Sequence, residues 1–172
     1  EDVSLAVRIP MHSGTVVIHG APTHLLRQIA WSISRTLRYE VQPIWRTQSM
    51  LQASAKTQFD WRGSAGDGAK LAALLANLPA VYFEVDEFDD RERPLSRWLY
   101  APELGVKHRN LDESGNYVIT ENELRHAILS ATSGTSLEAQ LQLLIANPWE
   151  MVLEPLRIGI DLTADASVTR AG

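Results

Sequence analysis

A three-glycine turn is the part of this sequence whose residue types and spacing come closest to a chemical site. Residues 59–75 read Phe-Asp-Trp-Arg-Gly-Ser-Ala-Gly-Asp-Gly-Ala-Lys-Leu-Ala-Ala-Leu-Leu, so a strand-like run enters the glycines and an amphipathic helix leaves them. Backbone N–H groups at a helix N-terminus, together with the helix dipole, attract anions. The candidate contacts for a phosphate or carboxylate ligand are Arg62, Gly63, Gly66, Gly68 and Lys70.

The spacing of this turn departs from the known phosphate-binding loops. A G-x-x-x-x-G-K-[ST] loop has its lysine directly after the second glycine and a hydroxyl next, whereas here Ala69 intervenes and Leu71 follows Lys70. The glycine spacing also differs from that of a dinucleotide-binding turn. Asp67 would repel an anion and suits the N-cap position of the helix. A capped strand-to-helix corner is therefore the main expectation, and an anion or phosphopantetheine contact is the alternative.

The other ionisable groups form no recognisable catalytic or metal-binding arrangement. The chain has five histidines and no cysteine, and the histidines show none of the spacings typical of a zinc site. His19 and His24 flank a strand-to-helix corner, which leaves open a proton-transfer pair. Glu84 and Asp86 share a strand face, where carboxylates are more often solvated than catalytic. We expect no metal site and no cofactor.

Tryptophan is frequent, with five in 172 residues. Alternation along a strand places Trp61 on one face with Phe59, and Trp98 on one face with Tyr100. On an open sheet face, Trp61, Trp98 and Tyr100 would form an aromatic platform for a partner. Packing beneath the C-terminal helices is the default expectation.

The composition is that of an ordinary globular protein, with 45% hydrophobic and 22% charged residues. Sixteen basic and 21 acidic residues give a net charge of −5, which argues against a surface that neutralises nucleic-acid phosphates. No apolar run approaches the roughly 20 residues that span a bilayer, and no signal-peptide pattern is visible. We expect a cytoplasmic protein without nucleic-acid or membrane partners; its oligomeric state is not readable from the sequence.

The elements that must position these groups follow a β-α-β-β-α-β order over residues 14–88. Strands are expected at residues 15–19, 41–46, 57–62 and 80–85. One helix runs from Pro22 to about Arg38 and another from the glycine turn to Pro79. Each helix has one apolar stripe, as expected if both cover the same face of an antiparallel sheet. The order is that of a ferredoxin-like fold.

Residues 95–162 are predicted to pack on residues 14–88 as an extension, within one cooperative domain. Residues 97–100 and 106–109 are expected to form a β-hairpin, and a short strand is expected at 116–119. The fold class is therefore α+β, a ferredoxin-like βαββαβ core with a β-hairpin extension and two C-terminal helices. The termini, residues 1–11 and 163–172, are expected to be weakly ordered.

Two capping boxes predict where the C-terminal helices begin. Thr120 precedes Glu123 by three residues, and Thr135 precedes Glu138 by the same spacing. In a capping box the hydroxyl accepts a backbone N–H while the glutamate reaches back to the cap. The second helix is expected to end at Asn147-Pro148.

Three segments together resemble a known family. They are Phe59–Leu71, Ala101–His108 and Asn147–Arg157, and the strand Thr15–Pro22 adds to the similarity. The family is an uncharacterised actinobacterial family of small proteins, one of the domains of unknown function, and the similarity covers residues 14–159. The resemblance implies a cytoplasmic bacterial protein, often encoded beside type II fatty-acid synthesis genes. It supplies no catalytic residues.

Three functions remain open. The leading hypothesis is a non-catalytic accessory or regulatory protein that binds acyl carrier protein or another fatty-acid synthesis component. Acyl carrier proteins are acidic, so docking needs a local basic surface, for which Arg27, Arg35 and Arg38 on the first helix are the candidates. The alternative is a small-molecule-sensing ferredoxin-like domain. The third is an enzyme that uses the turn with His19 or His24.

Overall fold

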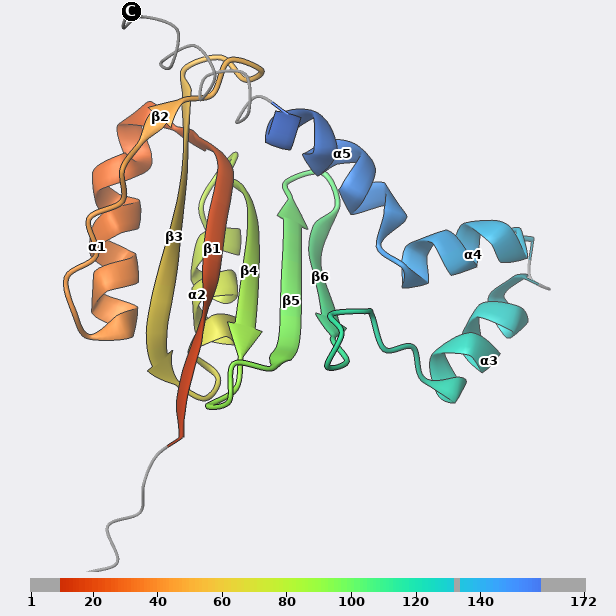
Figure 1. The fold of residues 1–172 in the computed structure, drawn as a ribbon. Helices are drawn as coiled ribbons and strands as arrows, with labels where there is room; N and C mark the ends of the chain where they lie inside the picture. The colour runs from red at the N-terminus through yellow and green to blue at the C-terminus, as the bar shows by residue number, and fades with distance from the viewer. Residues whose placement is uncertain (1–9, 132–133, 159–172) are drawn as a thin grey trace, which may run out of the picture.

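The computed structural model describes residues 10–131 and 134–158, and Figure 1 shows their arrangement. Most of the two termini, and residues 159–162 of the predicted extension, lie outside the described residues. The strands are β1 (Met11–Pro22), β2 (Arg46–Thr47), β3 (Ser54–Ser64), β4 (Tyr82–Phe88), β5 (Pro94–Ala101) and β6 (Gly105–Asn110). The helices are the 3₁₀ turn η1 (Thr23–Leu25), α1 (Leu26–Leu37), α2 (Asp67–Ala76), α3 (Glu121–Ala131), α4 (Leu137–Leu144) and α5 (Asn147–Ile158).

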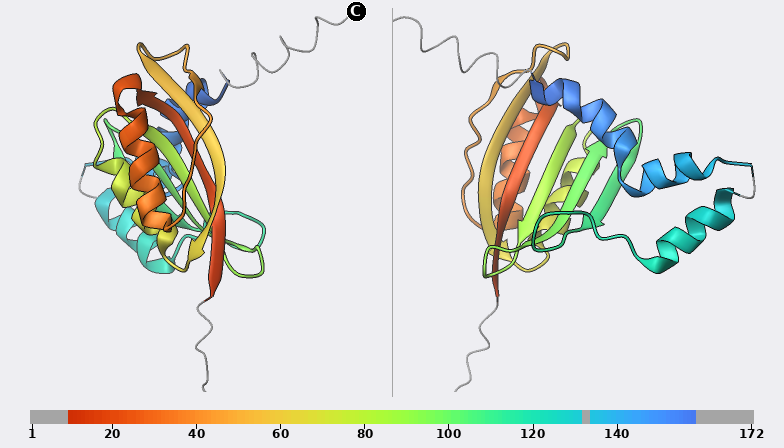
Figure 2. Two further views of the ribbon diagram at one scale, coloured as in Figure 1. Left: turned by 90° about the vertical axis from the view of Figure 1, so that its left-hand side faces the viewer. Right: turned by 45° about the vertical axis from the view of Figure 1, so that its right-hand side comes forward.

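The strands form one antiparallel six-stranded sheet in the order β2-β3-β1-β4-β5-β6. Helices α1 and α2 cover one face, and α5 crosses the other (Figure 2). The predicted α+β class is confirmed, as is the expectation that the first two helices share a face. The predicted β-hairpin is confirmed as β5 and β6, which extend the sheet from β4.

The main core lies between the sheet and helices α1 and α2. Alternate strand residues such as Val16 and Val85 are fully buried there, because side chains on a strand alternate between faces. Ile29 and Ile33 meet them from α1. Gly14 makes room for a tryptophan in this core: a Cβ atom at Gly14 would lie 2.6 Å from Nε1 of Trp61.

Two of the predicted strands are wrong: one is much shorter than expected, and the other does not form. The second strand covers only Arg46–Thr47, because the preceding residues run extended beside α1 without a ladder, and Pro43 lacks a backbone donor. Residues 116–119 form no strand; Tyr117 makes a single bridge to Leu111.

The C-terminal part contains three helices, where the sequence predicted two. Asn147-Pro148 begins α5 instead of only ending α4, because proline suits the first turn of a helix as well as the position after one. The capping box before α3 is confirmed: the N–H of Glu123 donates to Oγ1 of Thr120, and the N–H of Thr120 donates to Oε2 of Glu123. The second cap is shifted by one residue, since Ser136 accepts the N–H of Ala139.

Helices α3 and α4 form a hairpin that stands away from the sheet (Figures 1 and 2). Helix α3 packs mainly against α4, and α4 packs against α3 and α5. None of the described helices has both the length and the apolar character needed to cross a membrane.

Candidate functional site

The glycine turn already holds an anion, and that anion is a side chain of the same protein. Gly66, at φ 89°, precedes α2, and its N–H donates to Oε1 of Glu87 over 2.9 Å. The same carboxylate lies 2.7 Å from Nδ1 of His12. A Cβ atom at Gly68 would lie 2.6 Å from Oε2 of Glu87. The position that a phosphate would take at this helix N-terminus is therefore filled by Glu87, which the sequence analysis did not connect with the turn.

A second carboxylate closes the other side of the turn. Asp67 is the first residue of α2 and not its predicted N-cap, which is Gly66. Its Oδ2 accepts the N–H of Ser64 over 2.8 Å, and its Oδ1 accepts Nζ of Lys70 over 2.9 Å. Burial alone would raise the pKa of Asp67, but the hydrogen bonds from Lys70 and Ser64 outweigh burial and lower it. Lys70 is therefore occupied by an internal carboxylate.

The five residues predicted to bind an anion thus do not form an open site. Gly63 and Gly68 face Asp67 and Glu87 respectively. The side chain of Arg62 is exposed, and its backbone N–H donates to the hydroxyl of Tyr39. The main expectation of a strand-to-helix corner holds, and the anion-binding alternative is wrong for the turn as it is filled here.

The two histidines proposed to act with the turn lie at the other end of the sheet. His12 pairs with Gly63, while His19 is seven residues further along β1, roughly 23 Å at the rise of a strand. His19 is buried, and its Nε2 lies 3.0 Å from Oε2 of Glu84. His24 belongs to η1, beyond the end of the strand. The proposed pairing of His19 or His24 with the turn is therefore wrong.

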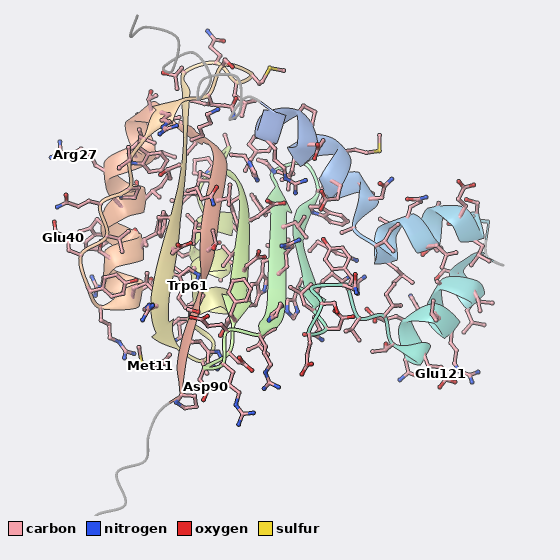
Figure 3. All side chains as sticks on the ribbon, viewed as in Figure 1. Met11, Arg27, Glu40, Trp61, Asp90 and Glu121 are labelled. Carbon is pink, nitrogen blue, oxygen red and sulfur yellow. The ribbon has the colours of Figure 1, made fainter. Side chains whose placement is uncertain are left out.

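The aromatic strand residues are covered by helices. Trp61 is 1% exposed and Trp98 is 9% exposed, and Figure 3 shows Trp61 inside the sheet region. Tyr100 stacks on Phe83 with ring centroids 5.1 Å apart. The aromatic platform predicted from Trp61, Trp98 and Tyr100 is wrong, and buried packing is confirmed. The covering helices are α1 and α2, not the C-terminal helices, because these side chains point to the α1 and α2 face.

The three arginines predicted to bind a partner lie around a groove on the outer side of α1. Arg27, Arg35 and Arg38 are all exposed, and Figure 3 shows Arg27 and Glu40 on this side. The groove has a volume of about 700 Å³. We call it the α1 groove; its lining is Leu26, Arg27, Ala30, Trp31, Ser34, Arg38, Tyr39, Glu40, Val41, Gln42, Pro43 and Trp45.

One wall of the α1 groove is residues 39–45, which we call the strap. Ser34 of α1 fixes it, because its Oγ accepts the N–H of Val41 over 2.9 Å and donates to the carbonyl of the same residue. Thr57 of β3 donates its hydroxyl to the carbonyl of Ile44 over 2.9 Å. The hydroxyl of Tyr39 accepts the N–H of Arg62. These hydrogen bonds fix the strap against α1 and β3, and so they fix the shape of the groove.

Trp31 is the groove residue that the sequence analysis missed. Its side chain is 61% exposed, and the guanidinium of Arg35 lies 5.3 Å from its ring centroid, within the range of a cation–π contact. A signal was present in the sequence: Trp31 falls off the buried stripe of Ile29 and Ile33 at helical spacing.

The arginines around the groove form no close ion pairs with other described residues. Within the described ranges, no carboxylate comes within ion-pair distance of Arg27, Arg35 or Arg38. Glu40 is the acidic residue of the lining, and its Oε1 accepts Nε2 of Gln42 over 2.6 Å. The arrangement is an apolar groove with an exposed tryptophan and a mostly basic rim.

The comparison with protein families identifies the chain's family. A family model described as "Protein of unknown function (DUF3145)" matches residues 15–170. No curated protein and no solved structure matches the chain. The match confirms the part of the resemblance that assigns nearly the whole chain to a domain of unknown function.

Proposed function

Since the chain belongs to the family of proteins of unknown function DUF3145, we propose from its own surface that it is a non-catalytic accessory or regulatory protein that binds a partner protein in the α1 groove. The observation that carries the proposal is the exposed ring of Trp31 beside an apolar groove with a basic rim. Exposed tryptophan and arginine are the residue types that most often dominate binding energy at interfaces.

The partner that fits this groove is an acidic amphipathic helix. Leu26, Ala30 and Trp45 offer an apolar floor, which suits the apolar face of a helix laid in a groove. Arg27 and Arg38 would then meet carboxylates on the flanks of that helix. Acyl carrier protein, or another component of fatty-acid synthesis, has the required acidity, and we propose it as the partner on the strength of the resemblance noted in the sequence. We also propose that the protein acts in the cytoplasm.

The proposal is tested by titrating purified acyl carrier protein into the protein and measuring affinity by calorimetry. Trp31→Ala should weaken binding about 30-fold, because it removes the central aromatic contact. Arg27→Glu and Arg38→Glu should each weaken it about tenfold, since each places a carboxylate opposite the acidic partner. Higher salt should also weaken the complex, because exposed charges are screened.

Arg91→Glu is the matched control, since Arg91 is also an exposed arginine and lies at the turn between β4 and β5. It should leave the affinity within about twofold, as expected for a surface charge away from the contact. If Arg91→Glu weakens binding as much as Arg27→Glu does, the attraction is a general effect of charge and the groove is not the site. If the wild type binds no acidic carrier protein, that partner is wrong.

A small-molecule sensor is the second candidate, favoured by the size of the groove. About 700 Å³ falls within the range of ligand pockets, and the lining is largely apolar. In this case an apolar small molecule would raise the melting temperature and shift the fluorescence of Trp31. Ser34→Ala would reduce both effects by loosening the strap.

We further propose that residues 14–88 are a ferredoxin-like unit. The support is the strand order β2-β3-β1-β4, with α1 between β1 and β2 and α2 between β3 and β4. Ferredoxin-like domains follow this β-α-β-β-α-β connection.

A further inference from the structure

The hairpin of α3 and α4 leaves most of its large apolar side chains in contact with water. Of the described residues, only Ala127 is buried on α3, and α4 has no buried residue. Six aliphatic side chains of the hairpin region are 40–55% exposed: Leu124, Ile128, Leu137, Leu141, Leu143 and Ile145. Single exposed apolar residues are ordinary, but a group of this size on one projection marks an interaction surface.

The spacing of these residues gives each helix a continuous apolar stripe. Leu124 and Ile128 are four residues apart on α3, as are Leu137 and Leu141 on α4, so each pair lies on one face of its helix. Although α3 packs on α4, each helix shields its neighbour from one side only. The side chains of both stripes keep 40–55% of their surface exposed, which a second pair of helices could cover.

The charged residues near the stripes form ion pairs within the chain on α3, and they are few on α4. Arg125 pairs with Glu121 on α3, and Arg109 of β6 pairs with Glu123. On α4 the single charged residue is Glu138. This surface therefore has no uncompensated charge cluster that would select an oppositely charged partner, and it does not repel a surface like itself. The α1 groove differs, because its basic rim would favour an acidic partner and would repel a second copy of itself.

We propose that this surface binds a second copy of the same chain, so that two α3–α4 hairpins form a four-helix bundle about a twofold axis. A twofold contact places the same patch on both subunits, and a neutral apolar stripe is complementary to itself. The hairpin projects beyond the β6 edge of the sheet (Figure 1), so a second hairpin can approach it without meeting the sheet.

The size of the patch agrees with a dimer contact. Five of the six half-exposed Leu and Ile side chains, all but Leu143, lie at four-residue spacing and present apolar surface on the order of a few hundred Å². A stable protein interface buries about 800 Å² on each partner. This area includes an apolar centre and a polar rim around it. The hairpin supplies that centre.

Sedimentation velocity and light scattering on the full chain test the proposal directly. The wild type should have twice the mass of the 19.1 kDa chain, and Ile128→Glu or Leu141→Glu should have the single mass, because each places a charge in the apolar contact. High salt should leave the dimer intact. The control is Ile44→Glu, which makes the same change at an isoleucine that is 78% exposed on the strap, and it should stay dimeric. A wild type that remains monomeric at about 100 µM, well above the Kd of a stable homodimer, overturns the proposal.

The absence of cysteine from the chain allows a second test that does not depend on how well a glutamate variant folds. Of Ile128→Cys and Leu141→Cys, each in its own protein, the variant whose position lies nearer the twofold axis should form disulfide-linked dimers on mild oxidation, since residues near such an axis meet their own copies. Ile44→Cys should not. If neither hairpin variant links faster than Ile44→Cys, the contact is not at this surface, even where a dimer forms.

Discussion

At the scale of single residues, the glycine turn shows how a chain can fill its own anion site. Gly63, Gly66 and Gly68 give the backbone shape that binds anions, and the spacing to Lys70 argues against a phosphate loop. What the sequence cannot show is that Glu87, 21 residues after Gly66, supplies the anion. That contact depends on how α2 lies across β4, which is a property of the packed sheet and not of any local pattern.

Removing the Glu87 carboxylate should destabilise the fold and create the site that the wild type lacks. Glu87→Ala leaves the N–H of Gly66 and the ring of His12 without their partner, and we expect a loss of about 2 to 3 kcal/mol in the free energy of unfolding. Glu87→Gln keeps an acceptor and should lose about 1 kcal/mol of the same free energy. Urea denaturation measures both, with Glu113→Ala as an exposed control expected to cost about 0.5 kcal/mol or less.

Inorganic phosphate separates this role from simple loss of packing. It should raise the melting temperature of Glu87→Ala, because the vacated helix N-terminus favours an anion, and should leave that of the wild type unchanged. Equal effects of phosphate on the two proteins would show that Glu87 does not occupy an anion position.

At the scale of elements, local signals predicted what lies within one element and failed where two elements share a boundary. The stripe of Ile29 and Ile33 and the capping box at Thr120 are local, and both match the structure. The interpretation of Pro148 as only a helix end is wrong, because proline can follow one helix and also begin the next. The strand predicted at residues 41–46 is mostly strap, since nothing in residues 41–45 shows that Ser34 of α1 would take the hydrogen bonds of Val41.

The role of Ser34 in fixing the strap can be measured against a matched hydroxyl on the same helix. Ser34 bonds the carbonyl of Ala30 and the strap, whereas Thr36 bonds the carbonyl of Ser32. Ser34→Ala should cost about 1 to 2 kcal/mol of stability and speed hydrogen exchange at the amide of Val41. Thr36→Val should leave hydrogen exchange at the amide of Val41 unchanged. Unchanged exchange in Ser34→Ala would mean that the strap is held by its other contacts.

At the scale of the whole molecule, the two faces of the sheet are stabilised by different physics. The face under α1 and α2 is an apolar core, while the face under α5 combines a small apolar cluster with buried charge. There Glu84 of β4 bonds both His19 of β1 and Arg157 of α5, so one carboxylate joins two strands to the last helix. Arg157 also pairs with Glu150. The attachment of α5 should therefore depend on pH.

Burial alone would raise the pKa of Glu84, but hydrogen bonds and charges from His19 and Arg157 outweigh burial and lower it from 4.5 to about 2. A lowered pKa in the folded state stabilises the protein fully above pH 4.5, and this contribution is lost as the pH falls from 4.5 to about 2. The shift corresponds to about 3 kcal/mol.

Glu84→Gln should therefore be less stable than the wild type by up to about 3 kcal/mol at neutral pH. Urea denaturation across the acid range should show the two curves converging between pH 4.5 and about 2. Asp89, whose pKa is also lowered, to about 2, mainly by backbone hydrogen bonds in its turn, affects both proteins equally and cancels in the difference. A gap that stays constant as the pH falls would assign the effect to packing at position 84, and the charge of Glu84 would then not be what holds α5 to the sheet.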